Sequence, residues 1–245
     1  MNRFFFEPVD NTVSAVTLDQ EESHHLVNVL RLPVGMEIEL FDGTGNLYVG
    51  RIETAGKRVT ARLLEKVVRD SGKKTALWVY QGDLKGKKLD LVVQKCAELG
   101  VDCFVPFTSG RSQGRLDRQR WERRHERWRK IIKSACKQSG RLRFMDVLEE
   151  QTLEHIYSSA ETTGPALKIL FWESERTRRL SDFDWPLSEH RICLMLGTEG
   201  GFSIQEARTA ETHGWQAVSL GKQILRAETA TIAAISIVQF LRGII

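Results

Sequence analysis

The sequence predicts a small β-barrel domain over residues 1–72, followed by an α/β domain with a parallel sheet over residues 73–245. Three observations lead to this division. Short apolar runs separated by tight turns fill the first part of the chain. Residues 69–74 contain no apolar side chain, which is typical of a linker. After that segment, apolar strand-like runs alternate with helical patterns, as in a parallel sheet covered by helices.

The first part contains four expected strands, at residues 13–18, 36–41, 46–53 and 58–68. Glycine-containing turns at residues 42–45 and 55–56 connect the last three of these strands as hairpins. Between the first two strands, Asp19 is a candidate helix N-cap. Glu22, three residues later, completes a capping-box pattern, so a short helix carrying His24 is expected there.

The second part alternates strands and helices. Strands are expected at residues 76–80, 103–107, 167–172, 192–196 and 217–220. Helices are expected at residues 89–99, at about 116–138, from Ser203 onward, and at 228–241. This βα alternation is what predicts the parallel sheet.

The long helix at about 116–138 has an apolar side and a basic side. Residues 111–143 contain thirteen Lys or Arg and three carboxylates, whereas the net charge of the whole chain is only +4. Such a basic segment is the expected footprint of a polyanion-binding face, although a solvated helix face without a ligand is the alternative. The basic side carries Arg120, Arg123, Arg127, Lys130, Lys133 and Lys137, and the apolar side carries Trp121, Trp128, Ile131, Ile132 and Ala135.

Composition argues against several classes of protein. The four cysteines form no CxxC pair and no ligand spacing with histidine, so neither a zinc site nor a disulfide framework is expected. No apolar run is long enough to span a bilayer, and the apolar part of the N-terminus is too short for a signal peptide. We therefore expect a cytoplasmic protein with reduced, buried thiols, without metal and without membrane contact.

Two apolar runs end in glycine-rich turns. Residues 192–196 lead into Gly197-Thr198-Glu199-Gly200-Gly201, and residues 217–220 lead into Gly221. Gly197, Gly200 and Gly201 can take positive φ and let a ligand approach the main chain closely. The pair of turns predicts one site at the ends of neighbouring strands, and neither a GxGxxG nor a P-loop pattern is present. A ligand-free strand-helix connection is the alternative for a single turn.

The two turns belong to longer motifs. Residues 197–203 (GTEGGFS) and 220–230 (LGKQILRAETA) resemble the C-terminal signature of the bacterial 16S ribosomal RNA uridine-N3 methyltransferases, which are SPOUT-class enzymes. Proline is usual in that family at the position of Thr198, and glutamate at the position of Lys137. Further segments agree in order along the chain, namely Arg3-Phe4-Phe5, His24-His25-Leu26, Val29-Leu30-Arg31-Leu32, and residues 95–101, 110–112 and 138–141.

This resemblance implies a PUA-like RNA-binding barrel followed by a SPOUT-type parallel sheet with a C-terminal trefoil knot. It also implies S-adenosyl-L-methionine as the cofactor, 16S rRNA in the small subunit as the partner, and a homodimer whose interface includes the apolar last helix. The cofactor-binding residues that it implies are Leu196, Gly197, Glu199, Gly200, Gly201, Leu220, Gly221, Ile224, Leu225 and Arg226.

The chemistry implied by the resemblance is methyl transfer to uracil N3, which is a poor nucleophile while it holds its proton. Arg226 is the candidate for stabilising the uracil anion, and Glu199 and Glu228 are the nearby carboxylates. The alternatives are structural: Glu199 as a partner for the helix start at Ser203, and Glu228 in a salt bridge at the start of the last helix.

RNA contacts are expected from both parts of the chain. The candidate residues are Arg3, His24, Arg31, Arg111, Arg120, Arg123, Arg127, Lys130 and Arg141. Two other functions remain open from the sequence: a SPOUT methyltransferase for another rRNA or a tRNA position, and a non-catalytic RNA-binding assembly factor. Cofactor binding separates enzyme from binder, and methyl mapping separates the two enzymes.

Overall fold

The computed structural model describes residues 2–7, 13–67, 75–110, 117–159, 165–183, 185 and 191–245. The chain divides into two compact units. Unit 1 comprises Met1–Gly72 and Lys133–Phe144, and unit 2 comprises Lys73–Ile132 and Met145–Ile245. The sequence suggests a single division at residue 72, so the grouping of residues 133–144 with unit 1 is a feature that the sequence does not predict.

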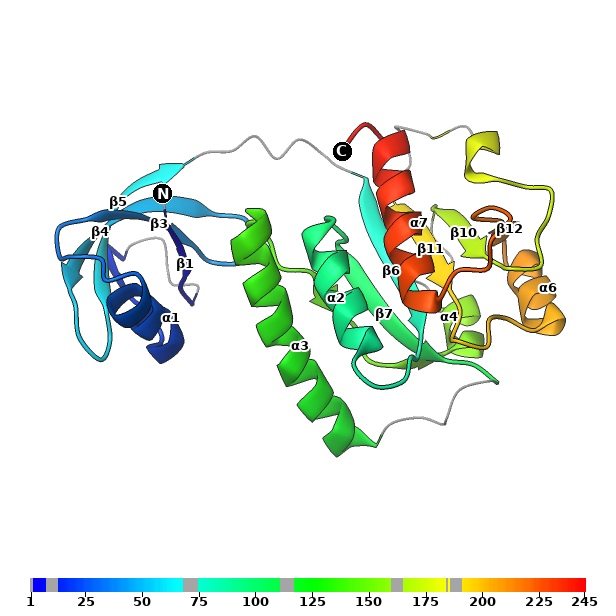
Figure 1. Ribbon diagram of the computed structural model, residues 1–245, viewed down its shortest axis with the longest axis horizontal. Helices are drawn as coiled ribbons and strands as arrows, with labels where there is room; N and C mark the ends of the chain where they lie inside the picture. The colour runs from blue at the N-terminus through cyan, green and yellow to red at the C-terminus, as the bar shows by residue number, and fades with distance from the viewer. Residues whose placement is uncertain are drawn as a thin grey trace. The chain divides into compact units, whose positions relative to one another are not determined.

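Unit 1 is built on a five-stranded sheet in the order β1-β3-β4-β5-β2 (Figure 1). Its strands are β1 (Arg3–Phe5), β2 (Ala15–Thr17), β3 (Glu37–Phe41), β4 (Leu47–Thr54) and β5 (Thr60–Val67). β1 pairs with β3 in parallel, and the other pairs are antiparallel. Phe4 and Val16, from the two edge strands, share one buried core cluster. The sheet therefore curls around its core, as expected for a small barrel.

The short helix of unit 1 begins where its cap predicts. Asp19 accepts a hydrogen bond from the Glu22 amide at 2.7 Å, and α1 (Gln20–His24) continues into a π-helical turn, His25–Val29. The capping box is not completed, because the Glu22 carboxylate is buried against Lys133 and Lys137 at 3.3 and 2.7 Å. These two lysines are therefore engaged within unit 1, and the prediction that they extend an exposed basic helix face is wrong.

Unit 2 contains a parallel sheet in the order β12-β10-β11-β6-β7-β8, with β9 also paired to β7 (Figure 1). The predicted strands are confirmed within a few residues. They are β6 (Ala76–Gly82), β7 (Cys103–Thr108), β10 (Leu167–Phe171), β11 (Arg191–Leu196) and β12 (Gln216–Val218); the short β8 (Asp146–Val147) and β9 (Gln151–Thr152) were not predicted. β10 lies between β11 and β12, so the two glycine turns follow strands that flank β10 and do not pair with each other.

Helices cover the sheet of unit 2. They are α2 (Lys88–Glu98), the part of α3 (Arg118–Ser139) up to Ile132, α4 (Leu153–Ser158), the 3-10 turn η2 (Leu180–Asp182), α6 (Ile204–Thr212) and α7 (Ala227–Leu241). Alternation along β11 sends Cys193 and Met195 into the core cluster that includes α4 and α6. α2 and α7 lie beside each other (Figure 1). The predicted amphipathic helix is confirmed in α3, where Trp128 is buried against Phe104.

All four cysteines are buried and free, as predicted. Among the described residues, no helix is long and apolar enough to cross a membrane. No group of three metal-ligating side chains occurs in the same residues. The trefoil knot stays a prediction of the family resemblance.

Candidate functional site

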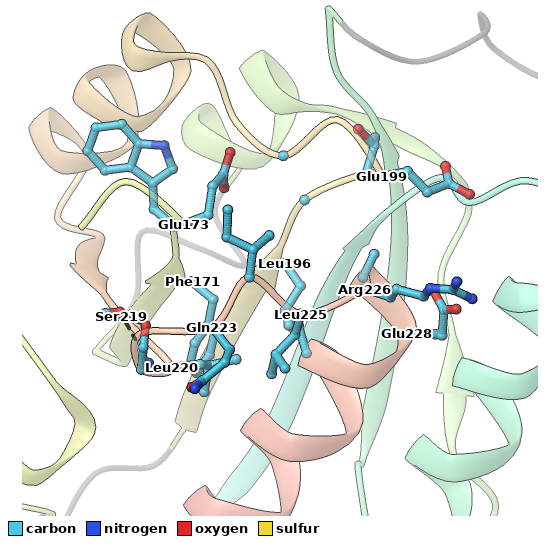
Figure 2. A pocket seen from close by; sticks show the side chains of 18 of the residues that line it. Phe171, Glu173, Leu196, Glu199, Ser219, Leu220, Gln223, Leu225, Arg226 and Glu228 are labelled. Atoms are coloured by element: carbon cyan, nitrogen blue, oxygen red, sulfur yellow. Dashed lines mark hydrogen bonds between the residues drawn. The ribbon is translucent and has the colours of Figure 1, made fainter. Parts of the chain in front are cut away.

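A pocket of about 760 Å³ opens at the carboxyl ends of β10, β11 and β12. All the residues predicted to bind the cofactor line it, from Leu196 to Gly201 after β11 and from Leu220 to Arg226 after β12. Arg226 and Glu228 lie at one end of the pocket, and Ser219 and Leu220 lie at the other (Figure 2). The predicted convergence of two glycine turns on one site is therefore observed.

Sequence reasoning missed a third segment of the pocket, which follows β10. Phe171, Trp172, Glu173 and Arg176 line the cavity from this strand end, and Lys88 lines it from the start of α2. The Trp172 indole donates to the Phe202 carbonyl at 3.4 Å, which fixes the wall beside the β11 turn. The apolar run at residues 167–172 was the available signal, since ligands bind where neighbouring parallel strands end.

Residues 197–201, here called the β11 turn, are stabilised by hydrogen bonds to Thr198. The Thr198 carbonyl accepts from the Gly201 amide at 3.0 Å, and its hydroxyl accepts from the Gly200 amide at 3.2 Å. Of the three glycines of this turn, Gly201 uses the freedom of positive φ, at 63°. The hydrogen bonds of Thr198 close the turn with a single left-handed residue.

The backbone at the end of the neighbouring strand β6 packs directly against this turn. A Cβ at Gly82 would lie 2.6 Å from the Thr198 nitrogen and 2.8 Å from the Gly197 carbonyl carbon. Only glycine lets the two backbones approach this closely. Gln81, immediately before it, is fully buried and donates to the Gly197 carbonyl at 2.9 Å. No local pattern in the sequence predicts either contact.

Glu199 connects the β11 turn to the start of α2. Its carboxylate accepts from the Lys85 amide at 3.1 Å and from the Lys88 ammonium at 3.2 Å. Burial alone raises the pKa of this carboxyl, but those hydrogen bonds and the Lys88 charge outweigh burial and lower the pKa. The alternative role at the helix start is filled by Glu206, whose carboxylate accepts from the Ser203 amide at 2.8 Å.

Residues 219–226, here called the β12 segment, are more open. Ile224 is 78% exposed and Leu225 is 36% exposed. Gly221 has φ of 126°, and no atom lies within 4 Å of the position that its Cβ would occupy. The Ser219 hydroxyl accepts from the Gly221 amide at 3.2 Å and lies 3.0 Å from the Gly221 carbonyl. This segment thus presents apolar side chains and backbone groups to the cavity.

Arg226 and Glu228 lie at the start of α7. Arg226 is the N-cap residue, is exposed, and makes no side-chain cap hydrogen bond. One carboxylate oxygen of Glu228, Oε2, is buried without a hydrogen-bond partner. Neither side chain has an ion-pair partner within 4.0 Å among the described residues, which argues against the structural alternative for Glu228. A buried carboxylate oxygen without a hydrogen-bond partner is uncommon in a folded protein and marks Glu228 as a residue whose role calls for an explanation.

The basic residues of α3 have more carboxylate partners than the sequence suggested. Arg127 pairs with Asp90 of α2 at 2.7 Å, Arg120 lies 3.3 Å from Asp117, and Lys130 lies 3.9 Å from Glu126. Arg123 bonds Gln119 at 3.3 Å. All four of these cations remain exposed, so they stay candidates for phosphate contacts. Arg111 lies outside the described residues.

The RNA candidates of unit 1 differ among themselves. Arg3 is largely buried and pairs with Glu39 at 2.6 Å, whereas His24 is exposed and lies 3.1 Å from the Asn28 amide nitrogen. Arg31 is exposed and is the non-glycine residue with positive φ, at 53°, among the described residues. Such a conformation is uncommon for arginine and is frequent at functional sites. Arg141 is half-buried.

Comparison with known proteins shows similarity to RNA methyltransferases over nearly the whole chain. The family described as "RNA methyltransferase domain" matches residues 71–239, and the "RNA methyltransferase PUA domain" matches residues 18–64. Ribosomal RNA small subunit methyltransferase E from Bacillus subtilis (strain 168) is 27% identical over 255 residues, which cover 99% of each chain.

Two solved structures are similar over nearly the whole chain. Ribosomal RNA small subunit methyltransferase E from Neisseria gonorrhoeae, bound to S-adenosyl methionine, has a TM-score of 0.86 at 33% identity, and 98% of each chain is covered. A methyltransferase from Legionella pneumophila, in complex with the bound cofactor SAM, has a TM-score of 0.86 at 29% identity. That match covers 98% of this chain and 97% of the other.

Proposed function

The chain belongs to the RNA methyltransferase family that carries an RNA methyltransferase PUA domain, and we propose that it uses S-adenosylmethionine to methylate N3 of a uridine in 16S ribosomal RNA. The observation that carries this proposal is the pocket formed by the ends of β10, β11 and β12. The relative from Neisseria gonorrhoeae, by its description, has the same activity class and binds the same cofactor. The cytoplasm, where ribosomes are assembled, is the proposed location.

The residues present fit this cofactor. Leu196, Leu225 and Phe171 supply apolar walls, as an adenine ring requires. The β11 turn and the β12 segment offer backbone donors and acceptors for the ring edge and the ribose. Carboxylates in the lining, among them Glu173 and Glu228, suit a ligand that carries a sulfonium and an ammonium group.

When bound, S-adenosylmethionine supplies an electrophilic methyl group to the uracil nitrogen. Arg226 would stabilise the negative charge that uracil develops as N3 loses its proton, because its guanidinium is exposed at the pocket rim and has no carboxylate partner within 4.0 Å among the described residues. The proton needs an acceptor. We assign the role of proton acceptor to Glu228, whose Oε2 has no hydrogen-bond partner. Glu199 is less suited to this role, because its carboxylate already accepts from Lys85 and Lys88 and its pKa is lowered.

RNA recognition would use both units. Arg123, Arg127 and Lys130 are exposed on α3 and suit phosphate contacts. His24 and Arg31 are the exposed candidates of unit 1, the unit in which the PUA domain matches. Arg3, by contrast, would have to leave Glu39 to contact RNA.

The protein would act as a homodimer on the assembled small subunit. Ile237 and Phe240 of α7 are 39% and 69% exposed, and Ile244 and Ile245 extend this apolar surface. A second copy of the chain is the proposed occupant of this face, because the last helix and the residues after it would otherwise expose large apolar side chains together. The oligomeric state in solution tests this part.

Two measurements test the function. Calorimetry should detect S-adenosylmethionine binding by the purified chain. Methyl mapping of RNA from a deletion strain should show one 3-methyluridine of 16S rRNA missing, and expression of the intact chain should restore it. A missing methyl group in transfer RNA would redirect the target, and a chain that binds RNA but no cofactor would be a non-catalytic assembly factor.

A further inference from the structure

A buried hydrogen-bond network connects the β11 turn to α7. Gln81, at the end of β6, and Thr231, in the second turn of α7, are both fully buried. The Thr231 hydroxyl donates to the Gln81 Oε1 at 2.5 Å. The Gln81 amide nitrogen donates to the Gly197 carbonyl at 2.9 Å and to the Gly82 carbonyl at 3.1 Å.

The side-chain amide of Gln81 is fully satisfied by these three bonds. Both of its N–H groups have a carbonyl acceptor, and its oxygen has a hydroxyl donor. Burying an amide is costly unless each group is paired, and an apolar side chain would fill a core position without that cost. A satisfied polar network is therefore a device that specifies one arrangement of the three segments that it joins.

The three segments are parts of the pocket. Gly197 begins the β11 turn, and Thr231 lies one helical turn after Ala227 and Glu228 at the start of α7. The Thr231 hydroxyl oxygen also lies 2.9 Å from the Ala227 carbonyl, so the network reaches the first turn of the helix that carries Arg226 and Glu228. Gln81 itself does not line the pocket.

We propose that Gln81 is a positioning residue that holds the Gly197 peptide group, and with it the β11 turn, in place for the cofactor and, through Thr231, fixes the first turn of α7 relative to that turn. This inference rests on the proposed function. The two arms of the network have separate consequences: the Gln81–Gly197 bond serves cofactor binding, and the Gln81–Thr231 bond serves the placement of Arg226 and Glu228 for turnover.

The test uses the full chain and isosteric variants. Gln81→Met removes both arms and should raise the S-adenosylmethionine Kd by about tenfold or more, because the β11 turn is no longer held in its binding conformation and must be ordered when the cofactor binds. Thr231→Val removes only the arm to α7, so it should keep the Kd within about threefold and lower single-turnover methylation at saturating substrates by about tenfold. Thr231→Ser keeps the hydroxyl and should restore turnover.

Gln239→Met is the matched control for stability. Gln239 is 2% exposed, lies on α7, and donates to the Leu99 carbonyl at 2.8 Å, but it does not line the pocket. The Gln239→Met variant should lower Tm to a similar extent as Gln81→Met and leave the cofactor Kd unchanged. If Gln81→Met does not fold, Thr231→Val and Thr231→Ser still decide the turnover arm.

The outcomes separate the two proposals. A wild-type chain that binds no S-adenosylmethionine overturns the proposed function and this inference with it. A wild-type chain that binds and methylates, together with a Gln81→Met variant of equal Kd or a Thr231→Val variant of equal turnover, overturns the inference alone. Equal loss of affinity in Gln239→Met would reduce the role of Gln81 to general stability.

Discussion

The two loops that converge on the pocket are built in opposite ways. The β11 turn is closed by Thr198, seated on Gly82, bonded to Gln81 and anchored through Glu199 to Lys85 and Lys88. The β12 segment exposes Ile224 and Leu225, and open space surrounds the Cβ position of Gly221. One wall of the pocket is therefore preformed, and the other has few internal contacts among the described residues.

This difference suggests a division of labour. A preformed wall loses little conformational entropy when a ligand binds, so it should contribute affinity directly. The β12 segment leads into Arg226 and α7, where contacts that matter for turnover would form. We therefore expect changes in the β11 turn to act on cofactor affinity and changes at the end of the β12 segment to act on rate.

The largest effect is expected for Gly201→Val. Gly201 has φ of 63°, so a branched residue meets backbone strain, and its Cβ would overlap the Glu173 carboxylate, so this pocket-lining side chain would have to move. S-adenosylmethionine binding should be abolished in calorimetry while unit 2 remains folded by circular dichroism. Gly56→Ala, in unit 1, is the control, because its φ is outside the left-handed range and its Cβ would meet only the Arg58 carbonyl at 3.9 Å; it should leave the affinity unchanged. A folded Gly201→Val chain of unchanged affinity would remove the β11 turn from the site.

Arg226→Ala should have the next largest effect, and on rate. A guanidinium that stabilises charge on uracil acts mainly in the transition state, so single-turnover methylation should fall about a hundredfold, as for one lost electrostatic donor. Cofactor and RNA affinities should change much less. Arg226→Lys should recover only part of the rate, because an ammonium lacks the planar fork.

Lys222→Ala is the control for charge alone, since Lys222 is an exposed cation of the same segment and also lines the pocket. Its turnover should stay close to that of the wild type. Normal methylation by Arg226→Ala at saturating RNA would make Arg226 a binding or structural residue, and equal losses in both variants would point to general electrostatics.

The sequence predicts what is local and misses what is paired across the fold. The strands of unit 2 and the β11 turn follow from apolar runs that end in glycine, which a short window contains. The roles of Gln81, Glu173 and Lys88 follow from the strand order β10-β11-β6, which no local pattern encodes. The strand order also separates β11 from β12 by β10, whereas chain order suggested adjacent strands.

Charge shows the same limit. Periodicity placed Lys133 and Lys137 on the basic side of the long helix, and helical geometry alone supports that placement. Their carboxylate partners, Asp19 and Glu22, are more than a hundred residues away in the sequence. In the structure, the Lys133 ammonium lies 2.7 Å from Asp19 and the Lys137 ammonium lies 2.7 Å from Glu22. Only the folded chain decides whether a cation is paired or free for RNA.

A smaller effect is expected outside both loops, on RNA binding, when glutamine replaces Arg123, Arg127 and Lys130 together. RNA affinity should fall, and the slope of log affinity against log salt should flatten by about two to three, near one counterion for each lost phosphate contact. The cofactor Kd should stay unchanged. Arg208→Gln on α6, which loses an exposed pair with Glu211, is the control and should leave the slope in place. An unmoved slope in the triple variant would make this surface a solvated helix face.

The smallest effect is expected at the anchor of the β11 turn. The folded-state pKa of Glu199 lies below its ordinary value of 4.5, so the ionised anchor is complete above that value and is lost only as pH falls through the lower, folded pKa. Glu199→Gln keeps an acceptor for the Lys85 amide and loses the charge opposite Lys88. Because this ion pair is partly exposed, the cofactor Kd should rise by no more than about fivefold. The ratio of the cofactor Kd of Glu199→Gln to that of the wild type should stay constant from about pH 8 to about pH 6, because Glu199 is ionised throughout that range. A ratio that changes there would mean that Glu199 takes up a proton near neutrality, and Glu199 would then replace Glu228 as the proposed acceptor of the uracil proton.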